Sequence, residues 1–257
     1  MEQERKINTM IDCVHVGKTF ETPDGDHEVI RDLNFSAKEN EFLVLFGPGQ
    51  CGKTTIINLI AGFEQVTEGE VLAKGQKVDR PDVSRGVVFQ SISLFPWMTT
   101  MGNVEYGLKI KGVKKEERQK AAQKYIDLVR LTGFEKCYPH ELSGGMKQRV
   151  GIARAYTNNP RILLMDEPFG QLDAQTRYAM EEEVLRIWEQ EKRTIIFVTN
   201  NIEEAVYLAD RIVLLSNCPA KVKQIYDLKD LPRPRNTTDP EFLRIRKEIS
   251  DNTDLAL

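Results

Sequence analysis

Short apolar runs alternate with longer stretches of helical periodicity along this chain. Runs of about four to eight apolar or alternating residues predict strands, whereas apolar residues three or four positions apart predict amphipathic helices. In the first part of the chain the predicted elements are strands over residues 11–16, 28–37, 41–46, 70–74 and 86–90, and one helix over 53–63 that Gly62 closes. The chain therefore opens with a β-rich region.

The middle of the chain has a helical pattern instead. Thr99 or Thr100 is placed to cap a first helix, since a hydroxyl before a helix accepts hydrogen bonds from its first amides. The string KKEERQKAAQKYIDLVRL at 114–131 has the periodicity of a long amphipathic helix that Gly133 stops, and MKQRVGIARAYT at 146–157 predicts another helix.

After this helical segment, strands and helices alternate again. The predicted strands cover 161–167, 194–199 and 212–216, and the predicted helices between them cover 174–193 and 201–211. Parallel strands joined by crossover helices indicate an α/β fold with a mostly parallel core sheet. We expect one domain over 1–220 with a helical subdomain inserted at about 91–159, followed by a C-terminal tail over 221–257. In the tail LPRPR resists regular structure, and Asp239 before Pro240 predicts the start of a last short helix.

The composition argues against several classes of protein but does not assign a function. The 257 residues are 40% hydrophobic and 29% charged, and a formal net charge of −3 gives no basic field to attract nucleic acid. The longest apolar runs fall far short of the ~20 residues that span a bilayer, and the charged start MEQERKINTM is unlike a secretory signal. The cysteines have neither disulfide nor metal-ligand spacing, which is typical of reduced thiols; they are Cys13, Cys51, Cys137 and Cys218.

A glycine-rich loop joins a predicted strand to a predicted helix. GPGQCGKT at 47–54 fits the pattern GxxxxGK[ST] in the setting that phosphate binding requires, which disfavours a plain turn. There, glycines let backbone N–H groups turn toward phosphates, Lys53 supplies a point charge, and the hydroxyl of Thr54 is offered to Mg²⁺. The loop predicts a site for ATP and Mg²⁺ made by Gly47, Pro48, Gly49, Gln50, Cys51, Gly52, Lys53, Thr54 and Thr55.

Two further strings follow in order, LSGGMKQR at 142–149 and ILLMDEPFGQLD at 162–173. With them, the chain resembles the ATP-binding-cassette (ABC) transporter ATPases over nearly its whole length. The resemblance implies a P-loop NTPase with a RecA-like core sheet, an N-terminal antiparallel β subdomain and an inserted helical subdomain. It also implies a head-to-tail dimer, in which the phosphate loop of one cassette and Ser143, Gly144 and Gly145 of the other clamp each ATP. Taken alone, the SGG element also fits a simple helix cap and turn.

The resemblance assigns roles to single residues outside the loop. Asp166 and Glu167 end an apolar strand, which places their carboxylates at the C-terminal edge of the sheet. By resemblance Asp166 holds Mg²⁺, and Glu167 is the general base for the attacking water. Gln90 matches a glutamine that reaches Mg²⁺ or the attacking water. Phe20 matches an aromatic residue that stacks on adenine, and Asp173 matches a residue that couples the two nucleotide sites of the dimer. The predicted catalytic residues are Lys53, Gln90, Glu167 and Asn200, and the predicted metal ligands are Thr54, Gln90 and Asp166.

The loop after Gln90 is rich in apolar residues. Leu94, Phe95, Trp97 and Met98 cluster in SISLFPWMTTMGNVEYGL. An apolar cluster on a surface loop suits docking onto a membrane partner. Burial of the same side chains in the core is the alternative.

The chain departs from the family pattern at its predicted catalytic centre. Gly49 and Gln50 stand where the family usually has Ser-Gly, and Asn200 stands where it has a switch histidine. A positive φ at Gln50 costs on the order of 1 kcal/mol. An amide at Asn200 can donate a hydrogen bond to the γ-phosphate, but it cannot carry positive charge or relay a proton, so we expect slow hydrolysis. In the same loop, Lys53 and the helix dipole are expected to lower the pKa of the Cys51 thiol and make it reactive.

The strings ETPDGD, MDEPFGQLDAQTR and LPRPRNTTDPEFLRIRKEI make the chain similar to the nitrate, sulfonate, taurine and bicarbonate importer subfamily. This similarity implies a peripheral ATPase on the cytoplasmic face of the membrane, which energises import of a small anion or organic solute. Its implied partners are a membrane permease, a second cassette that is identical or paired, and indirectly an extracytoplasmic solute-binding protein. Two alternatives stay open. One is a weakly hydrolysing, degenerate cassette paired with an active one, and the other is a non-transport cassette ATPase that works on ribosomes or DNA.

Overall fold

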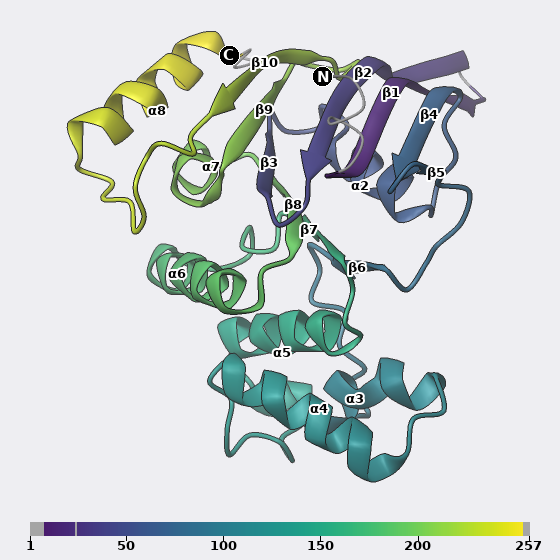
Figure 1. The fold of residues 1–257 in the computed structure, drawn as a ribbon, viewed down its shortest axis with the longest axis vertical. Coiled ribbons are helices and arrows are strands. Elements are labelled where there is room, and N and C mark those ends of the chain that lie inside the picture. Colours follow the sequence, from purple (N-terminus) through teal and green to yellow (C-terminus); the bar gives the residue numbers. More distant parts are fainter. Residues whose placement is uncertain (1–7, 24, 254–257) are drawn as a thin grey trace. The chain divides into compact units, whose positions relative to one another are not determined.

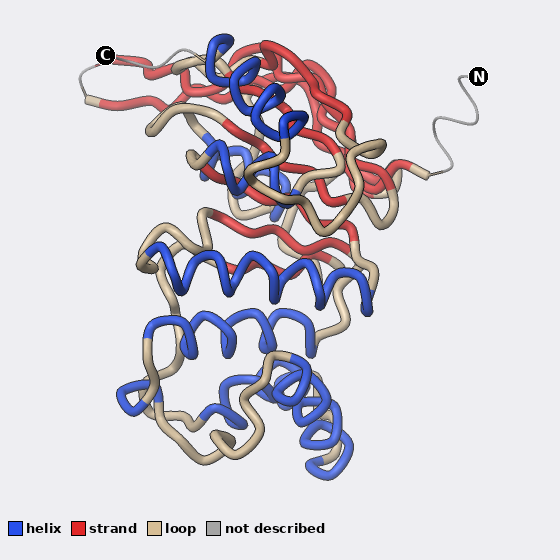
Figure 2. Tube along the Cα trace, turned by 90° about the vertical axis from the view of Figure 1, so that its left-hand side faces the viewer, coloured by secondary structure: helices blue, strands red, loops and turns tan. Residues whose placement is uncertain are grey.

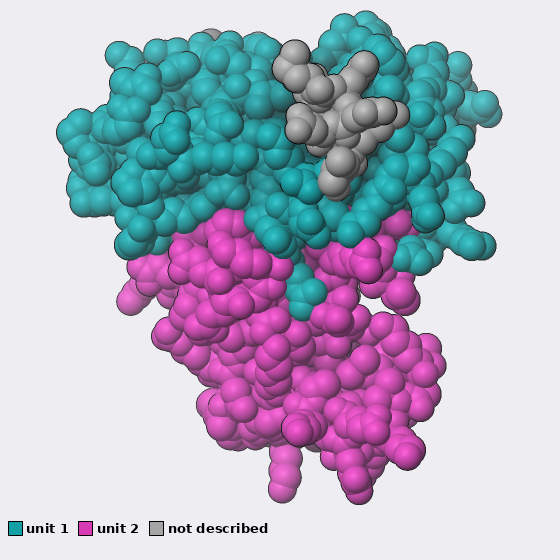
Figure 3. Space-filling view, in the orientation of Figure 1, with its two compact units in different colours: residues 1–82, 193–257 teal, residues 83–192 magenta. Residues whose placement is uncertain are grey.

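The computed structural model describes residues 8–23 and 25–253. The chain divides into two compact units, which Figure 3 colours teal and magenta. Unit 1 comprises residues 1–82 and 193–257, and unit 2 comprises residues 83–192. Each unit carries part of the predicted site.

Unit 1 contains an antiparallel sheet of four strands in the order β2-β1-β4-β5. The strands are β1 (Thr9–Thr22), β2 (Gly25–Lys38), β4 (Glu68–Ala73) and β5 (Gln76–Lys77). β1 pairs with β2 along one side and with β4 along the other. Ile11, Leu33 and Ala37 are fully buried in it. The expected N-terminal antiparallel β subdomain is therefore confirmed.

The second sheet of unit 1 is built around β3. Its strands are β3 (Phe42–Phe46), β8 (Thr194–Thr199), β9 (Arg211–Leu215) and β10 (Val222–Asp227). β3 lies between β8 and β9 and is parallel to both, whereas β10 is antiparallel to β9. Every residue of β3 and β8 is buried, as expected for parallel strands covered on both faces. The helices of this unit are α2 (Lys53–Ala61), α7 (Ile202–Leu208) and α8 (Pro240–Asn252), labelled in Figure 1.

Unit 2 is mainly helical (Figure 2). Its two strands, β6 (Arg85–Val88) and β7 (Ile162–Asp166), pair in parallel. Its helices are α3 (Thr100–Ile110), α4 (Lys115–Leu128), a 3₁₀ turn (Pro139–Glu141), α5 (Gly144–Thr157) and α6 (Ala174–Glu191). Helices α3, α4 and α5 pack on one another, and the rings of Tyr125 and Tyr156 lie 5.9 Å apart at the α4–α5 contact. Among the helices that the structure describes, none is long and apolar enough to cross a bilayer.

The predicted end of one helix was wrong. α4 ends at Leu128, not at Leu131, and Gly133 does not stop it. Arg130 turns the chain with φ 58°, and Leu131 N donates to Ile126 O at 2.9 Å, the bond that closes a helix with a left-handed residue after it. Arginine occupies the place that usually selects glycine. Burial of Leu131, which is 1% exposed, favours this early turn.

The predicted tail is also more regular than expected at its start. Residues from 222 to 227 form β10, which extends the sheet beside β9. α8 begins at Pro240 with Asp239 in the N-cap position, as predicted. The segment between them, which contains LPRPR, has no helix or strand among its described residues.

Candidate nucleotide site

The phosphate loop occupies the turn from β3 into α2. Its backbone enters the left-handed region twice, at Gln50 with φ 60° and at Gly52 with φ 108°. A Cβ at Gly52 would lie 2.9 Å from Val29 Cγ1, so only glycine fits there. The φ of Gln50 is positive, which for a non-glycine residue costs on the order of 1 kcal/mol. Such strain persists where surrounding structure dictates the backbone, which is common in ligand-binding loops.

The start of α2 provides the chemistry for an anion. Gly52, the N-cap residue, has no side chain that could accept from the amides of the first turn, so no capping side chain covers this helix N-terminus. Lys53 is 4% exposed, and its Nζ donates to Gly47 O at 3.1 Å and to Pro48 O at 2.6 Å. A buried ammonium group and a helix N-terminus thus share one loop. Both favour a bound phosphate.

The expectation for Cys51 was wrong. The thiol is 1% exposed, and this burial raises its pKa from the ordinary value of 9.0, outweighing the opposite effect of the Lys53 charge. Desolvation disfavours the thiolate more than the nearby ammonium stabilises it. The thiol is therefore protonated at neutral pH and poorly reactive. All four cysteines of the chain are free thiols.

Asn200 lies at the same sheet edge as the phosphate loop. β3 and β8 are parallel with Phe46 opposite Thr199, so the next residues, Gly47 and Asn200, both leave the C-terminal ends of neighbouring strands. Asn200 is exposed. Unit 1 therefore brings the phosphate loop and the predicted switch residue to one edge of its sheet.

The residues flanking Asn200 are held by hydrogen bonds. Thr199 Oγ1 donates to Glu204 Oε2 at 2.6 Å and accepts from Asn201 N at 2.9 Å. Asn201 Oδ1 accepts from Glu203 N at 2.9 Å and from Glu204 N at 3.3 Å, which caps α7. The backbone on both sides of Asn200 is consequently fixed to the first turn of α7.

Phe20, the predicted adenine-stacking residue, is half-buried on β1. Lys18 Nζ lies 4.5 Å from the centre of its ring. The same ammonium group donates to Glu64 Oε2 at 3.2 Å and to Gln65 O at 2.9 Å. Lys18 was not singled out from the sequence, because only the fold brings 64 and 65 to it.

In unit 2, the structure brings two predicted catalytic side chains together. Asp166 ends β7 and is 5% exposed, and Glu167 follows it with φ 39°, in the left-handed region. Gln90 Nε2 donates to Glu167 Oε2 at 3.3 Å. Glu167 O accepts from Gly170 N at 3.1 Å, which stabilises the turn after the strand. A strained acidic residue held by an amide is typical of a functional site.

Ser143 and Asp173 both act as helix caps. Ser143 Oγ accepts from Met146 N at 3.3 Å at the start of α5, and Asp173 Oδ1 accepts from Thr176 N at 3.0 Å at the start of α6. The bond from the Thr176 amide lowers the pKa of Asp173. A Cβ at Gly145 would lie 2.8 Å from Thr176 Cγ2, so glycine permits close packing of α5 on α6. The cap interpretation of the SGG element is thus realised, while a ligand role for Ser143, Gly144, Gly145 and Asp173 stays a prediction.

The apolar loop after Gln90 is partly exposed. Trp97 is 70% exposed, and the ring of Phe95 lies 5.7 Å from that of Trp97 and 4.6 Å from that of Tyr106. Leu94, Phe95 and Met98 are half-buried. Full burial in the core is therefore wrong for Trp97.

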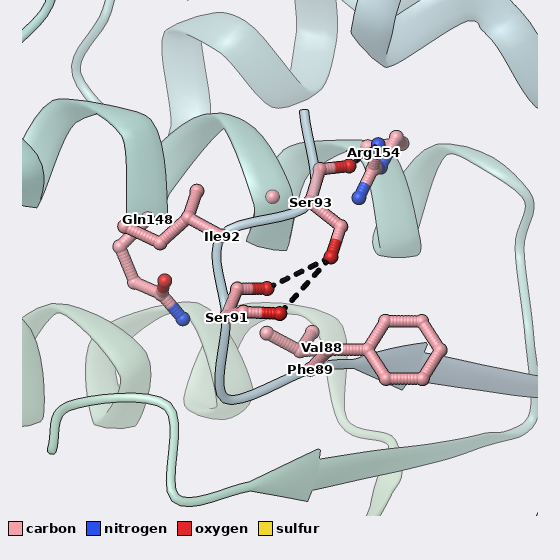
Figure 4. A pocket seen from close by; sticks show the side chains of 8 residues that line it. Val88, Phe89, Ser91, Ile92, Ser93, Gln148 and Arg154 are labelled. Atoms are coloured by element: carbon pink, nitrogen blue, oxygen red, sulfur yellow. Dashed lines mark hydrogen bonds between the residues drawn. The ribbon is translucent and has the colours of Figure 1, made fainter. Parts of the chain in front are cut away.

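Two polar residues that the sequence did not point to hold this loop. Asn103, fully buried, accepts from Phe95 N at 2.8 Å and donates to Phe95 O at 3.2 Å. Arg154 on α5 donates to Ser93 O at 2.7 Å, and its guanidinium lies 5.6 Å from the Phe95 ring. Figure 4 shows the small hollow that Arg154, Gln148 and the loop enclose. Neither residue stands in a motif of the sequence, because the fold alone brings Asn103 and Arg154 to the backbone of this loop.

Comparison with known proteins places the chain in a family. The family model described as ABC transporter matches residues 30–170, and the chain belongs to this family of ATP-binding cassettes. It is an ABC-type ATPase. It is 47% identical, over 97% of this chain and 93% of the relative, to an uncharacterized ABC transporter ATP-binding protein of Methanocaldococcus jannaschii. It is 43% identical, over 91% of this chain and 92% of the relative, to the aliphatic sulfonates import ATP-binding protein SsuB of Bacillus cereus.

Solved structures agree with this assignment. A dimeric bacterial ABC transporter cassette matches with a TM-score of 0.76 and 33% identity, covering 85% of this chain and 99% of that one. A second structure, described as the same cassette in a post-hydrolysis state with ADP and Pi, matches with a TM-score of 0.75 and 32% identity, over the same shares of both chains. The predicted fold class, a P-loop NTPase of α/β type, is confirmed.

Proposed function

We propose that this ABC-type ATPase energises the import of a small anion or organic solute, of the nitrate, sulfonate, taurine or bicarbonate type, through a membrane permease. The phosphate loop carries the ATPase part of the proposal, because a strained backbone, the buried Lys53 and a helix N-terminus together favour a bound polyphosphate. The importer part is supported by 43% identity to a sulfonate import protein over nine-tenths of both chains. A sulfonate is therefore the first solute to test.

The chain's own residues divide the proposed chemistry. Lys53 and the amides at the start of α2 neutralise the β- and γ-phosphates, and Asn200 donates a hydrogen bond to the γ-phosphate. Glu167 accepts the proton of the water that attacks the γ-phosphorus, while Gln90 orients the Glu167 carboxylate through its hydrogen bond. The water oxygen forms a bond to the γ-phosphorus while the bond from that phosphorus to the bridging oxygen breaks, and the products are ADP and inorganic phosphate.

The predicted metal ligands of the nucleotide site suit Mg²⁺ bound together with ATP. In the described part of the chain, no group of three or more His, Cys, Asp or Glu side chains could hold a metal ion. Mg²⁺ in nucleotide sites needs no such group, because phosphates and water supply most ligands beside one or two protein oxygens. Thr54, Gln90 and Asp166 are the residues proposed to hold it. When bound, Mg²⁺ would neutralise charge on the phosphates.

The proposed assembly has two cassettes and a permease. Ser143, Gly144, Gly145 and Asp173 of one cassette would meet the nucleotide of the other, in the head-to-tail arrangement that the resemblance implies. Phe95 and Trp97 form the surface proposed to dock onto the permease at the cytoplasmic face of the membrane. The exposure of Trp97 supports this assignment, since large exposed aromatics often anchor interfaces. A solute-binding protein outside the membrane would deliver the solute.

Assembly with the permease tests this proposal. The chain offers a matched pair, because Trp97 and Ile110 are each 70% exposed in unit 2. Trp97→Glu should weaken co-purification with the permease about tenfold or more, and leave ATP affinity of the isolated cassette unchanged. Ile110→Glu serves as the control with an intact complex. If the two variants co-purify equally well with the permease, the docking surface is wrong. If a sulfonate does not stimulate ATPase activity in proteoliposomes, the proposed solute is wrong.

A second candidate function rests on Asn200. With an amide at the switch position, the chain could be a degenerate cassette that clamps ATP and hydrolyses it too slowly to drive transport alone. We expect an intermediate outcome, with ATP binding intact and Asn200→His at least about tenfold faster than the parent, or ~1.4 kcal/mol of barrier. Steady-state ATPase rates in the assembled transporter check this, with Glu167→Gln as the inactive reference. A parent rate equal to that of Glu167→Gln would establish the degenerate cassette.

A further inference from the structure

The LPRPR segment at 231–235 has no role in the proposed catalytic site, yet its second arginine is buried. Arg235 is 6% exposed. Its Nη1 donates to Val206 O and to Ala209 O, each at 2.6 Å, and its Nη2 donates to Leu228 O at 2.8 Å. Two of these three carbonyls belong to the C-terminal end of α7, which Figure 1 shows beside the tail.

The first arginine of the segment reaches the same end of α7. Arg233 Nη2 donates to Leu208 O at 2.5 Å, and Nη1 donates to Asp210 Oδ1 at 2.6 Å. The other oxygen of that carboxylate, Asp210 Oδ2, accepts from Phe42 N at 2.9 Å. Phe42 is the first residue of β3, the strand that leads into the phosphate loop. The tail is thereby bonded to both α7 and β3.

These contacts match the needs of a short helix. The last carbonyls of a helix have no partner within it, and α7 has only seven residues. An isolated helix of that length is unstable, so its position depends on tertiary contacts. A guanidinium group offers five donors in a fixed plane and a positive charge that the helix C-terminus favours. Burial, followed by the charge of Arg233, lowers the pKa of Arg235 to about 10, which leaves it charged at neutral pH.

The opposite end of α7 joins the predicted switch residue. Asn201 caps the helix, and Thr199 bonds to Glu204, so Asn200 has little freedom independent of α7. Arg246 on α8 adds an ion pair with Glu203 in the first turn, at 3.2 Å. The tail therefore holds α7 at both ends.

We propose that Arg235, assisted by Arg233, is a positioning residue for ATP hydrolysis: it fixes α7 so that Asn200 stays at the edge where β3 enters the phosphate loop. The inference rests on the proposed role of Asn200 at the γ-phosphate. It gives the C-terminal tail a part in catalysis without contact to nucleotide. The hydrogen bonds of Arg233 and Arg235 to the C-terminal end of α7 together form a clamp. Misplacing a catalytic group by about 1 Å lowers rates by up to about a hundredfold, so the loss of the clamp should be visible in kcat.

The test compares tail variants of the full-length chain. Arg235→Ala should lower kcat about tenfold while ATP affinity stays within about twofold, since the phosphate loop is untouched. Amide hydrogen exchange should rise in 202–208, and Arg235→Lys should recover part of the rate. Arg244→Ala is the matched control, because in the described part of the chain the ion pairs of Arg244 are with Glu241 and Glu248, which are exposed on the same helix. Parental kcat and unchanged exchange in folded Arg235→Ala would overturn the clamp; should that variant not fold, Arg233→Ala and Arg235→Lys take its place.

A double variant separates this inference from the proposed function. If both proposals hold, Asn200→Ala lowers kcat, and adding Arg235→Ala changes it by less than about twofold, because both changes remove one interaction. If Asn200→Ala lowers kcat and the added Arg235→Ala lowers it again by the same factor as in the parent, the clamp is overturned and the role of Asn200 stands. An unchanged kcat in Asn200→Ala overturns the role of Asn200, whatever exchange in α7 reports.

Discussion

Two helices of this chain begin at glycine-rich motifs, and the structure builds their starts in opposite ways. Before α2 the backbone is strained, with φ 60° at Gln50 and φ 108° at Gly52, and the N-cap residue has no side chain. Before α5 the backbone is extended, and Ser143 Oγ accepts from Met146 N. The start of α2 thus has no capping side chain, whereas the start of α5 is capped by its own serine. The ligand role predicted for α2 involves one chain, while the ligand role predicted for α5 requires a second.

The largest effect should come from the lysine at the start of α2. Lys53→Ala removes the buried ammonium that lies between the loop carbonyls, and it should lower ATP affinity by about a hundredfold or more, or ~2.7 kcal/mol. Circular dichroism should show an intact fold, because the lysine serves phosphate and not the core. Lys74→Ala, at an exposed position of the same unit, is the control. Undiminished affinity for a labelled ATP analogue in folded Lys53→Ala would contradict the site.

An aspartate at the start of α5 can separate capping from ligand binding. Asp caps helices as well as Ser, so Ser143→Asp should keep the parental stability, whereas Ser143→Ala should lose about 1 kcal/mol in urea unfolding. A carboxylate facing a γ-phosphate is repelled, so Ser143→Asp should also lower dimer hydrolysis about tenfold or more. If the ATPase rate of Ser143→Asp equals that of the parent, Ser143 only caps α5 and does not bind nucleotide. The start of α2 would then be the only one of the two helix starts with a ligand role.

The smallest effect concerns the thiol beside α2. Because burial raises the pKa of Cys51, its thiolate fraction is small at neutral pH and grows only at a higher pH than for an exposed cysteine. Iodoacetamide at neutral pH should therefore modify Cys218 first and Cys51 slowly, with or without ATP. Mass spectrometry of tryptic peptides measures both rates, and Cys218→Ser confirms which peak belongs to which site. Equal rates would show that the loop opens in solution.

Local rules predicted the features that neighbouring residues determine. The phosphate loop, the acids at the end of β7 and the start of α8 follow from residue types within a few positions of each other. Features fixed by distant packing could not be predicted in this way. The turn at Arg130 that ends α4 goes with the burial of Leu131, and the pKa of Cys51 is raised because the fold covers its thiol.

The same limit applies to long side chains. Arg154 and Arg235 bind carbonyl groups that lie 61 and 26 to 29 residues away along the chain, with one nearer contact at Leu228. No periodicity or spacing rule describes such bonds. The sequence therefore predicted which residues meet the nucleotide in this family, but not which residues hold them in place.

The contact between Lys18 and Phe20 bears on which nucleotides the cassette distinguishes. Lys18 Nζ lies over the ring, at 4.5 Å from its centre, so a stacked base would lie on the opposite face. Stacking on one aromatic face contributes about 1–3 kcal/mol and does not read the hydrogen-bonding edge of the base. Guanine gains as much from such a stack as adenine does. If Phe20 is the stacking residue, selectivity among purine nucleotides comes from the number of their phosphates more than from their bases, and cellular abundance then determines which triphosphate the protein consumes.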